Sequence, residues 1–219
     1  QPFFGERFGN PSSLHRWGRQ ARVALDEARE RLARTLNAHP DEVCFTSGGT
    51  EGDNLAILGS ARAARESGRM AIVSTPIEHK AVLAAVHQAA REGFEERLVA
   101  VNGDGLVDLS DYSGLVDARV ALCSVMWVNN EIGVVQDIAA IGEMTRSRGI
   151  IFHVDSAQAT GKLPIDLAKL KPLVEQYLAS LPSTMKRREK ELDVGARVQD
   201  AAVFRDNLLG HRWRGAEDL

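Results

Sequence analysis

Cysteine is scarce in this chain, and no long apolar run occurs in it. The 219 residues include two cysteines, Cys44 and Cys123, and no CxxC pair. This spacing argues against a disulfide framework and a zinc site, and it favours buried thiols in a reducing cytoplasm. No apolar run approaches the ~20 residues that a membrane-spanning helix needs, so we expect no membrane segment.

Strong charge of one sign is also missing. The formal net charge is −3, from 27 basic and 30 acidic residues. A chain this close to neutrality gives no reason to expect a nucleic acid or an anionic membrane as a partner. Residues 1–20 contain neither a basic segment followed by an apolar one nor a cleavage pattern, so they do not resemble a secretory signal. We therefore expect a cytoplasmic protein.

Short apolar runs alternate with amphipathic segments through most of the chain. The apolar runs predict strands at 43–46, 71–75, 98–101, 120–127 and 150–154. Helical patterning predicts helices near 11–37, 51–66, 78–92, 108–116 and 137–148. Strands alternating with helices of this length indicate βαβ units. We predict an α/β fold, with a mainly parallel sheet and helices on both of its faces.

The composition changes after residue 170. Residues 172–181 are weakly amphipathic, and the charged run 186–191 is followed by apolar residues at helical spacing up to Gly210. Glutamates interleave with the basic residues of this run, which favours a solvated helix face over an anion-binding patch. We therefore divide the chain into a domain over 1–170 and a divergent helical tail over 171–219.

Two features of the domain could bind a ligand on chemical grounds. The turn Ser47-Gly48-Gly49-Thr50 opens a predicted helix, whose N–H groups and dipole attract a phosphate that the glycines let approach. Asp155 ends a predicted strand, at the edge where open α/β sheets bind ligands, and could hold a cationic ring nitrogen. Both patterns are common in α/β proteins, so neither decides the function alone.

Four blocks of the sequence together resemble the pyridoxal-phosphate-dependent cysteine desulfurases of the iron–sulfur-cluster type. They are Phe8 to His15 (FGNPSSLH), Phe45 to Asn54 (FTSGGTEGDN), Glu78 to Val82 (EHKAV) and Asn129 to Leu167. The blocks keep the family's order and spacing, from about residue 4 to about residue 171. The resemblance implies part of the large domain of a fold-type-I enzyme of the class V aminotransferases. It also implies pyridoxal phosphate as cofactor, L-cysteine as substrate, alanine and enzyme-bound sulfur as products, and a homodimer.

The resemblance also assigns cofactor-binding roles to single residues. Gly49 and Thr50 match the turn that binds the cofactor phosphate. Asp155 matches the carboxylate that partners the pyridine nitrogen, and Gln158 matches the residue that hydrogen-bonds the ring oxygen.

Two further residues take roles nearer the reacting atoms. His79 matches the imidazole that stacks on the pyridoxal ring and helps with proton transfer, and Asn130 matches a residue close to the ring oxygen and the substrate. From the residues alone, His79 could equally be a helix cap and Asn130 a turn asparagine. We predict that five of these side chains lie at the C-terminal edge of one parallel sheet: Thr50, His79, Asn130, Asp155 and Gln158.

The sequence departs from the family pattern after Asp155. The family's Ser-X-His-Lys turn, with its Schiff-base lysine, lies about 26 residues further on, and that count reaches Leu181, where the motif is absent. Lys186 is the nearest candidate, but the run Arg-Arg-Glu-Lys-Glu behind it is typical of an exposed helix. The family's nucleophilic cysteine and its substrate-binding arginine are also absent. We expect Cys44 and Cys123 to be unreactive thiols in buried strands.

These observations leave more than one function open. The chain could be a truncated cysteine desulfurase, with a partial cofactor site and no turnover of its own. It could instead be a non-catalytic interaction module that pairs with a complete desulfurase or a scaffold partner. A third alternative, a pyridoxal enzyme with rewired chemistry, would depend on Lys186.

Overall fold

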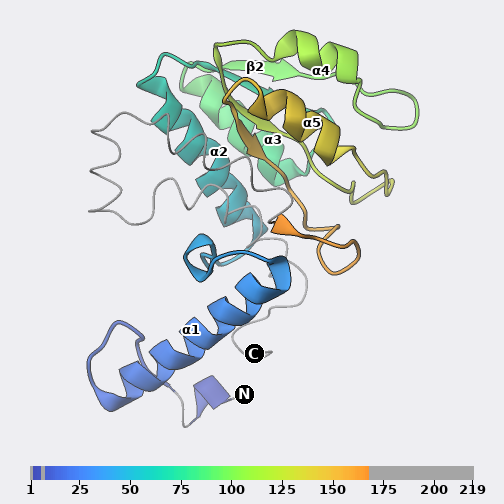
Figure 1. Cartoon of the computed structure of the whole chain (residues 1–219). Helices are drawn as coiled ribbons and strands as arrows, with labels where there is room; N and C mark the ends of the chain where they lie inside the picture. Colours follow the sequence, from blue (N-terminus) through green and yellow to red (C-terminus); the bar gives the residue numbers. More distant parts are fainter. Residues whose placement is uncertain (1, 6–7, 168–219) are drawn as a thin grey trace.

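A four-stranded parallel sheet organises the protein. The computed structural model describes residues 2–5 and 8–167. Its strands are β1 (Ala71–Ser74), β2 (Glu95–Leu98), β3 (Val120–Ser124) and β4 (Ile151–His153), in the order β2-β1-β3-β4 (Figure 1). All three strand pairings are parallel, so the predicted parallel sheet is confirmed. The predicted tail, the boundary at residue 170 and Lys186 lie outside the described residues.

Helices cover both faces of this sheet, as predicted. Two of them, α2 (Gly49–Arg65) and α3 (Lys80–Arg91), pack on one face through a cluster that includes Ile57 and Val86. The other two, α4 (Leu109–Leu115) and α5 (Ile138–Arg146), pack on the opposite face through Tyr112 and Ile141. No helix within the described residues has the length and apolar character that crossing a membrane requires.

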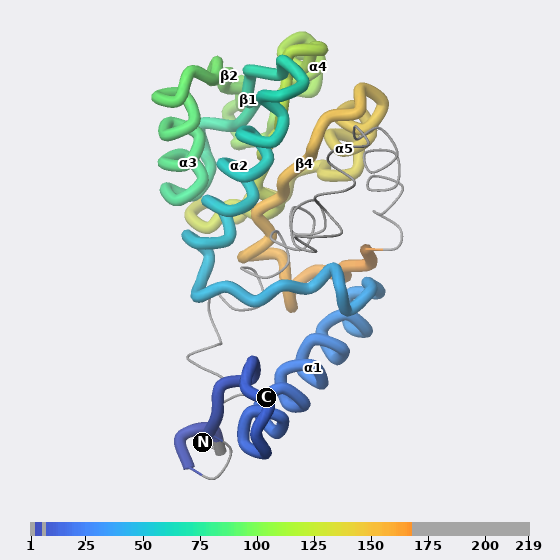
Figure 2. Tube along the Cα trace, turned by 90° about the vertical axis from the view of Figure 1, so that its left-hand side faces the viewer, coloured from blue at the N-terminus to red at the C-terminus, as the bar shows by residue number. Residues whose placement is uncertain are grey.

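The first helix, α1 (Arg16–Leu36), projects away from the sheet and reaches it through the segment that leads to α2 (Figure 2). Two short 3₁₀ turns, η1 (Pro2–Phe4) and η2 (Pro40–Glu42), flank it. Helix α1 begins later than the predicted residue 11. His15 caps it, with its Nδ1 accepting from the Gly18 N–H at 3.1 Å, and the turn before it holds Pro11.

The two central strands alternate between the two cores. Ile72 of β1 packs on the α2–α3 side, whereas its neighbours Ala71 and Val73 pack on the α4–α5 side. The pairing with β3 slips by one residue between Ala71 and Ile72, so Ala121 and Leu122 both face the α2–α3 side. A bulge of this kind sharpens the local twist of the sheet without breaking its alternation elsewhere.

Two predicted strands are wrong in position or type. Residues 43–46 form no strand, and Cys44 is only half-buried, so the prediction that Cys44 lies in a buried strand is wrong. Arg29 of α1 contacts this segment instead, donating to the Val43 carbonyl oxygen and lying over the Phe45 ring. The strand expected at 98–101 is β2, which comes earlier in the chain and carries two glutamates and an arginine.

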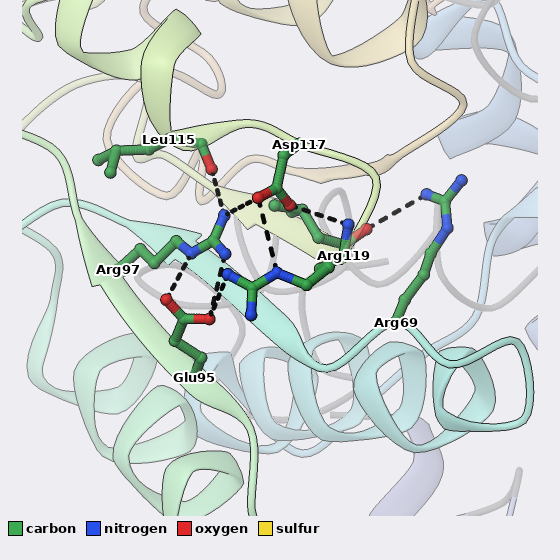
Figure 3. Close-up of polar contacts among 7 residues, drawn as sticks. Arg69, Glu95, Arg97, Leu115, Asp117 and Arg119 are labelled. Atoms are coloured by element: carbon green, nitrogen blue, oxygen red, sulfur yellow. Dashed lines mark hydrogen bonds and ion pairs between the residues drawn. The ribbon is translucent and has the colours of Figure 1, made fainter.

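Ion pairs hold the edge strand β2 at the amino end of the sheet (Figure 3). The guanidinium of Arg97, which is buried, donates to both carboxylate oxygens of Glu95 at 3.0 and 3.1 Å. Its remaining nitrogen donates to the Leu115 carbonyl oxygen at 2.7 Å and lies 3.1 Å from an oxygen of Asp117. Arg119 reaches Glu95 as well, at 3.0 Å. These contacts join β2 to the loop between α4 and β3.

Candidate functional site

The carboxyl ends of β1, β3 and β4 meet at one edge of the sheet. Strand β2 lies on one side of β1 and β3 on the other, so the order of connection reverses between β1 and β3. Open α/β sheets bind their ligands in the crevice at such a reversal. His79 follows β1, Asn130 follows β3, and Asp155 and Gln158 follow β4, so all four lie in the loops of this edge.

Asp155 extends the pairing of β3 with β4 past the ends of both strands. Its backbone carbonyl oxygen accepts from the Trp127 N–H at 2.9 Å, and its Oδ1 accepts from the Ala157 N–H, also at 2.9 Å. Burial raises the pKa of the Asp155 carboxyl, and the charge of His79 opposes that rise. The structure thus brings His79 and Asp155 into one electrostatic neighbourhood, although they are far apart in the sequence.

His79 caps a helix, which is one of the two roles that the sequence left open. Its Nδ1 accepts from the Ala81 N–H at 3.2 Å, so the side chain caps α3. The ring is nevertheless exposed, and the Nδ1 bond puts the proton of a neutral imidazole on Nε2. A capping histidine with its other nitrogen open to the site can still bind a ligand or transfer a proton.

The N-terminus of α2 lies at the same edge. Asp53, in its second turn, lies 3.6 Å from Nε2 of His153, the last residue of β4. Gly48 caps α2 without a side-chain hydrogen bond, and a Cβ at Gly48 or Gly49 would meet nothing within 4 Å. The side chain of Thr50 is exposed. The N–H groups and dipole of a helix N-terminus suit an anion such as a phosphate.

A buried polar chain holds α2 against the sheet. Nδ1 of His153 lies 2.8 Å from the Ser124 hydroxyl, and Nε2 faces Asp53. Burial lowers the pKa of His153 to about 4, so the ring is neutral near neutral pH and its contact with Asp53 is polar, without an ion pair. The trio has the composition of a hydrolase triad, but Ser124 and His153 are buried away from any substrate. Its role is to position α2.

Asn129, rather than its neighbour Asn130, is the structural asparagine of the loop after β3. Its Nδ2 donates to the Ile77 carbonyl oxygen at 2.8 Å, and its Oδ1 accepts from the N–H groups of Glu131 and Ile132. Asn130 is exposed. In the loop after β4, Oε1 of Gln158 accepts from Nζ of Lys162 at 2.6 Å.

Sequence reasoning missed Glu78, whose carboxyl is buried at this edge. Its Oε1 accepts from the Thr75 hydroxyl at 2.7 Å and from the Met126 N–H at 2.8 Å. Its Oε2 has no hydrogen-bond partner among the described residues. Burial, with a contribution from the charge of Asp155, raises the pKa of Glu78 to about 8. In the sequence Glu78 is a charged residue beside His79, and no local pattern there indicates that its side chain is buried.

The two cysteines play no part at this edge. Cys123 lies inside β3, and burial raises the pKa of its thiol to about 12, so the prediction of a buried, unreactive thiol is supported for Cys123. Cys44 lies in the segment before α2. Within residues 2–5 and 8–167, no group of three or more His, Cys, Asp or Glu side chains is placed to hold a metal ion.

Comparison with known proteins shows which proteins this chain is similar to. The family model described as aminotransferase class-V matches residues 1–173. The cysteine desulfurase IscS of Photorhabdus laumondii is 56% identical over 165 residues, and that of Proteus mirabilis is 53% identical over the same length. Each match covers 75% of this chain and 41% of the relative, so the chain spans less than half the length of these curated relatives.

Solved structures give the same result. A NifS-like protein superposes with a TM-score of 0.74 at 37% identity, covering 78% of this chain and 47% of that one. The cysteine desulfurase of Thermococcus onnurineus superposes with a TM-score of 0.69 at 28% identity, covering 77% of this chain and 42% of that one.

Proposed function

The chain belongs to the class-V aminotransferase family, and from that premise we propose that its carboxyl-edge site binds pyridoxal phosphate as part of a cysteine desulfurase. The observation that carries the proposal is the placement of His79, Asp155 and the N-terminus of α2 at the one edge of the sheet where the strand order reverses. We propose L-cysteine as the substrate of a desulfurase that contains this site.

The residues present fit the cofactor group by group. A phosphate dianion suits the N–H groups at the start of α2, where Gly49 leaves room and Thr50 can add a hydroxyl donor. The Asp155 carboxylate suits a protonated ring nitrogen, and the exposed His79 ring can stack on the face of the pyridine. Gln158 can donate its amide N–H to the ring oxygen. When bound, pyridoxal phosphate supplies an electron sink for the substrate.

The side chains of this site mainly bind and orient the cofactor and the substrate, and few of them take part in the reaction itself. Asp155 would keep the ring nitrogen protonated, His79 would hold or pass a proton at Nε2, and Asn130 would face the substrate. The printed sequence has no Ser-X-His-Lys motif, and we do not assign the lysine's role to Lys186. We therefore propose that this chain binds the cofactor non-covalently and does not turn over cysteine by itself.

An absorbance titration of the purified chain with pyridoxal phosphate tests the proposal. Asp155→Asn removes the charge that partners the ring nitrogen, and a charge-assisted hydrogen bond is worth about 1.5–3 kcal/mol, so affinity should fall by about tenfold or more. Asp104→Asn makes the same change in an exposed loop and serves as the control. Equal affinities for the two variants would contradict the proposed site, as would a wild-type chain that does not bind the cofactor.

A second function, pairing with a partner protein, is favoured by apolar side chains at the N-terminal end. Phe4, Leu14 and Trp17 are 78%, 88% and 49% exposed, and Phe8 stacks on Trp17 with the ring centres 6.2 Å apart. Exposed apolar clusters commonly mark protein–protein contacts. Light scattering of the chain, alone and mixed with a complete desulfurase, tests this. Monomers in both samples would exclude the pairing.

A further inference from the structure

Glu78 links the loops that carry the two ionisable groups of the site. It lies between the end of β1 and the end of β3, and it is 6% exposed. Its Oε1 joins the Thr75 hydroxyl, on its own loop, to the Met126 N–H, on the other. The next residue is His79, and Trp127, which follows Met126, donates its N–H to the Asp155 carbonyl oxygen. Oε1 of Glu78 therefore helps to set how these loops lie relative to each other, together with the hydrogen bond from Asn129 to the Ile77 carbonyl oxygen.

The free oxygen of Glu78 distinguishes its two protonation states. As a carboxylate, Oε2 would carry charge in a buried position with no donor among the described residues. As a carboxylic acid, Oε2 would lack only an acceptor for its proton, which costs far less than an unpaired buried charge. The ionisable group that interacts with the Glu78 carboxyl is Asp155, whose negative charge disfavours a second one nearby. His79 in turn interacts with Asp155. The contact from β3 is a backbone N–H.

We propose that Glu78 is a positioning residue of the cofactor site that works in its protonated form, bracing the His79 loop against the Asp155 loop and leaving Asp155 as the one carboxylate charge facing the ring nitrogen. This inference rests on the proposed function. A carboxyl group with a purely structural role could work in either protonation state, whereas the role proposed for Glu78 depends on its side chain being neutral.

Three variants separate these possibilities. Glu78→Gln keeps the Oε1 acceptor and fixes the side chain in a neutral state, Glu78→Leu removes the acceptor, and Glu27→Gln makes the neutralising change on the exposed face of α1. Pyridoxal phosphate affinity is measured by absorbance at neutral pH. We expect Glu78→Gln and Glu27→Gln to bind within about twofold of the wild type. Glu78→Leu should bind about tenfold more weakly, because it leaves both the Thr75 hydroxyl and the Met126 N–H without their acceptor.

A second measurement needs no cofactor. Urea unfolding of the same chains is followed from pH 6 to pH 9. The fold favours protonated Glu78, so the wild type should lose stability relative to Glu78→Gln as the pH rises through about 8, and Glu27→Gln should stay parallel to the wild type. Parallel curves for Glu78→Gln and the wild type would overturn the neutral state, even if Glu78→Leu failed to fold.

The outcomes separate this inference from the function on which it rests. If the wild type binds the cofactor and Glu78→Leu binds equally well, the positioning role is wrong and the proposed function stands. If Glu78→Gln binds as weakly as Glu78→Leu, the site uses a charged Glu78 and the inference is wrong. If the wild type does not bind at all, the proposed function fails and the positioning role fails with it, while the unfolding curves still decide the protonation state.

Discussion

Glu78 and His153 are buried ionisable side chains whose pKa values move in opposite directions. Burial raises the pKa of Glu78 from 4.5 to about 8 and lowers the pKa of His153 from 6.5 to about 4. The folded protein therefore keeps both side chains uncharged across a wide range of pH. Each shift links folding to proton binding, with opposite sign.

We expect these two linkages to cancel between about pH 4.5 and 6.5. The Glu78 contribution to stability is fully present below its unfolded pKa and is lost as the pH rises through about 8. The His153 contribution is fully present above its unfolded pKa and is lost as the pH falls through about 4. Relative to the wild type, His153→Gln should therefore lose unfolding free energy across this window as the pH rises, and Glu78→Gln should gain it. Each change should be at most about 3 kcal/mol.

Urea unfolding at three pH values in this window checks the cancellation. His87→Gln, at an exposed histidine on α3 whose Nδ1 lies 2.8 Å from Glu96, is the control for the loss of a histidine at the surface. Two single variants whose curves both run parallel to that of the wild type would show that neither side chain is held neutral by the fold.

At the scale of elements, two of the three glycines of helix α2 have different expected roles. Gly49 is the first residue of the helix and Gly59 lies in its interior, and a Cβ at either position would meet nothing within 4 Å. Alanine is favoured over glycine inside a helix by about 0.5–1 kcal/mol. Neither substitution should therefore harm the fold.

We expect the two alanine variants to differ in cofactor binding. Gly59→Ala should raise the unfolding free energy and leave pyridoxal phosphate affinity unchanged. Gly49→Ala should fold normally but bind more weakly, because its methyl group would occupy the space where a phosphate meets the backbone N–H groups. Thermal melts and absorbance titrations of both variants measure this contrast. Unchanged affinity in Gly49→Ala would place the phosphate elsewhere.

At the scale of the whole molecule, the two central strands of the sheet could be predicted from the sequence, whereas the position of the edge strand β2 could not. Strands β1 and β3 are buried along their whole length, so each is a continuous apolar run. Strand β2 has one neighbour and one buried residue, Arg97, so its charged sequence lacks the apolar run that predicts a strand. The segment 43–46 is apolar but packs beneath α1, a tertiary contact that no local pattern encodes.

The candidate site divides in the same way. The placement of Asp155 and His79 at this edge could be predicted because each lies in the loop after a strand, and strand ends can be recognised locally. The roles of Glu78 and His153 depend on which strands are neighbours. Met126 reaches Glu78 only because β3 lies beside β1, and Ser124 reaches His153 only because β4 lies beside β3. Strand order is a property of the whole fold.

Thiol labelling of the two cysteines should report on two different motions of the fold, a local one at Cys44 and a global one at Cys123. Cys123 lies in the middle of the sheet between two helical layers, so labelling it requires the whole layer to open. Cys44 is half-buried outside the sheet and should be labelled first. A thiol reagent should therefore modify one cysteine rapidly in native buffer and the second at the rate of global unfolding. Equal rates in native buffer would contradict this placement of Cys123.

The strand order also has a consequence for synthesis on the ribosome. Strand β1, helix α3 and strand β2 are made in succession and can pair as soon as they emerge, whereas the Met126 N–H that completes the Glu78 contacts comes 48 residues after Glu78. Until residues 120–124 emerge, the nascent chain presents the bare edge of β1, an apolar strand with unpaired backbone groups. That interval is when a nascent chain of this protein is most exposed to mispairing with its neighbours, and slowing translation between β2 and β3 should lengthen it.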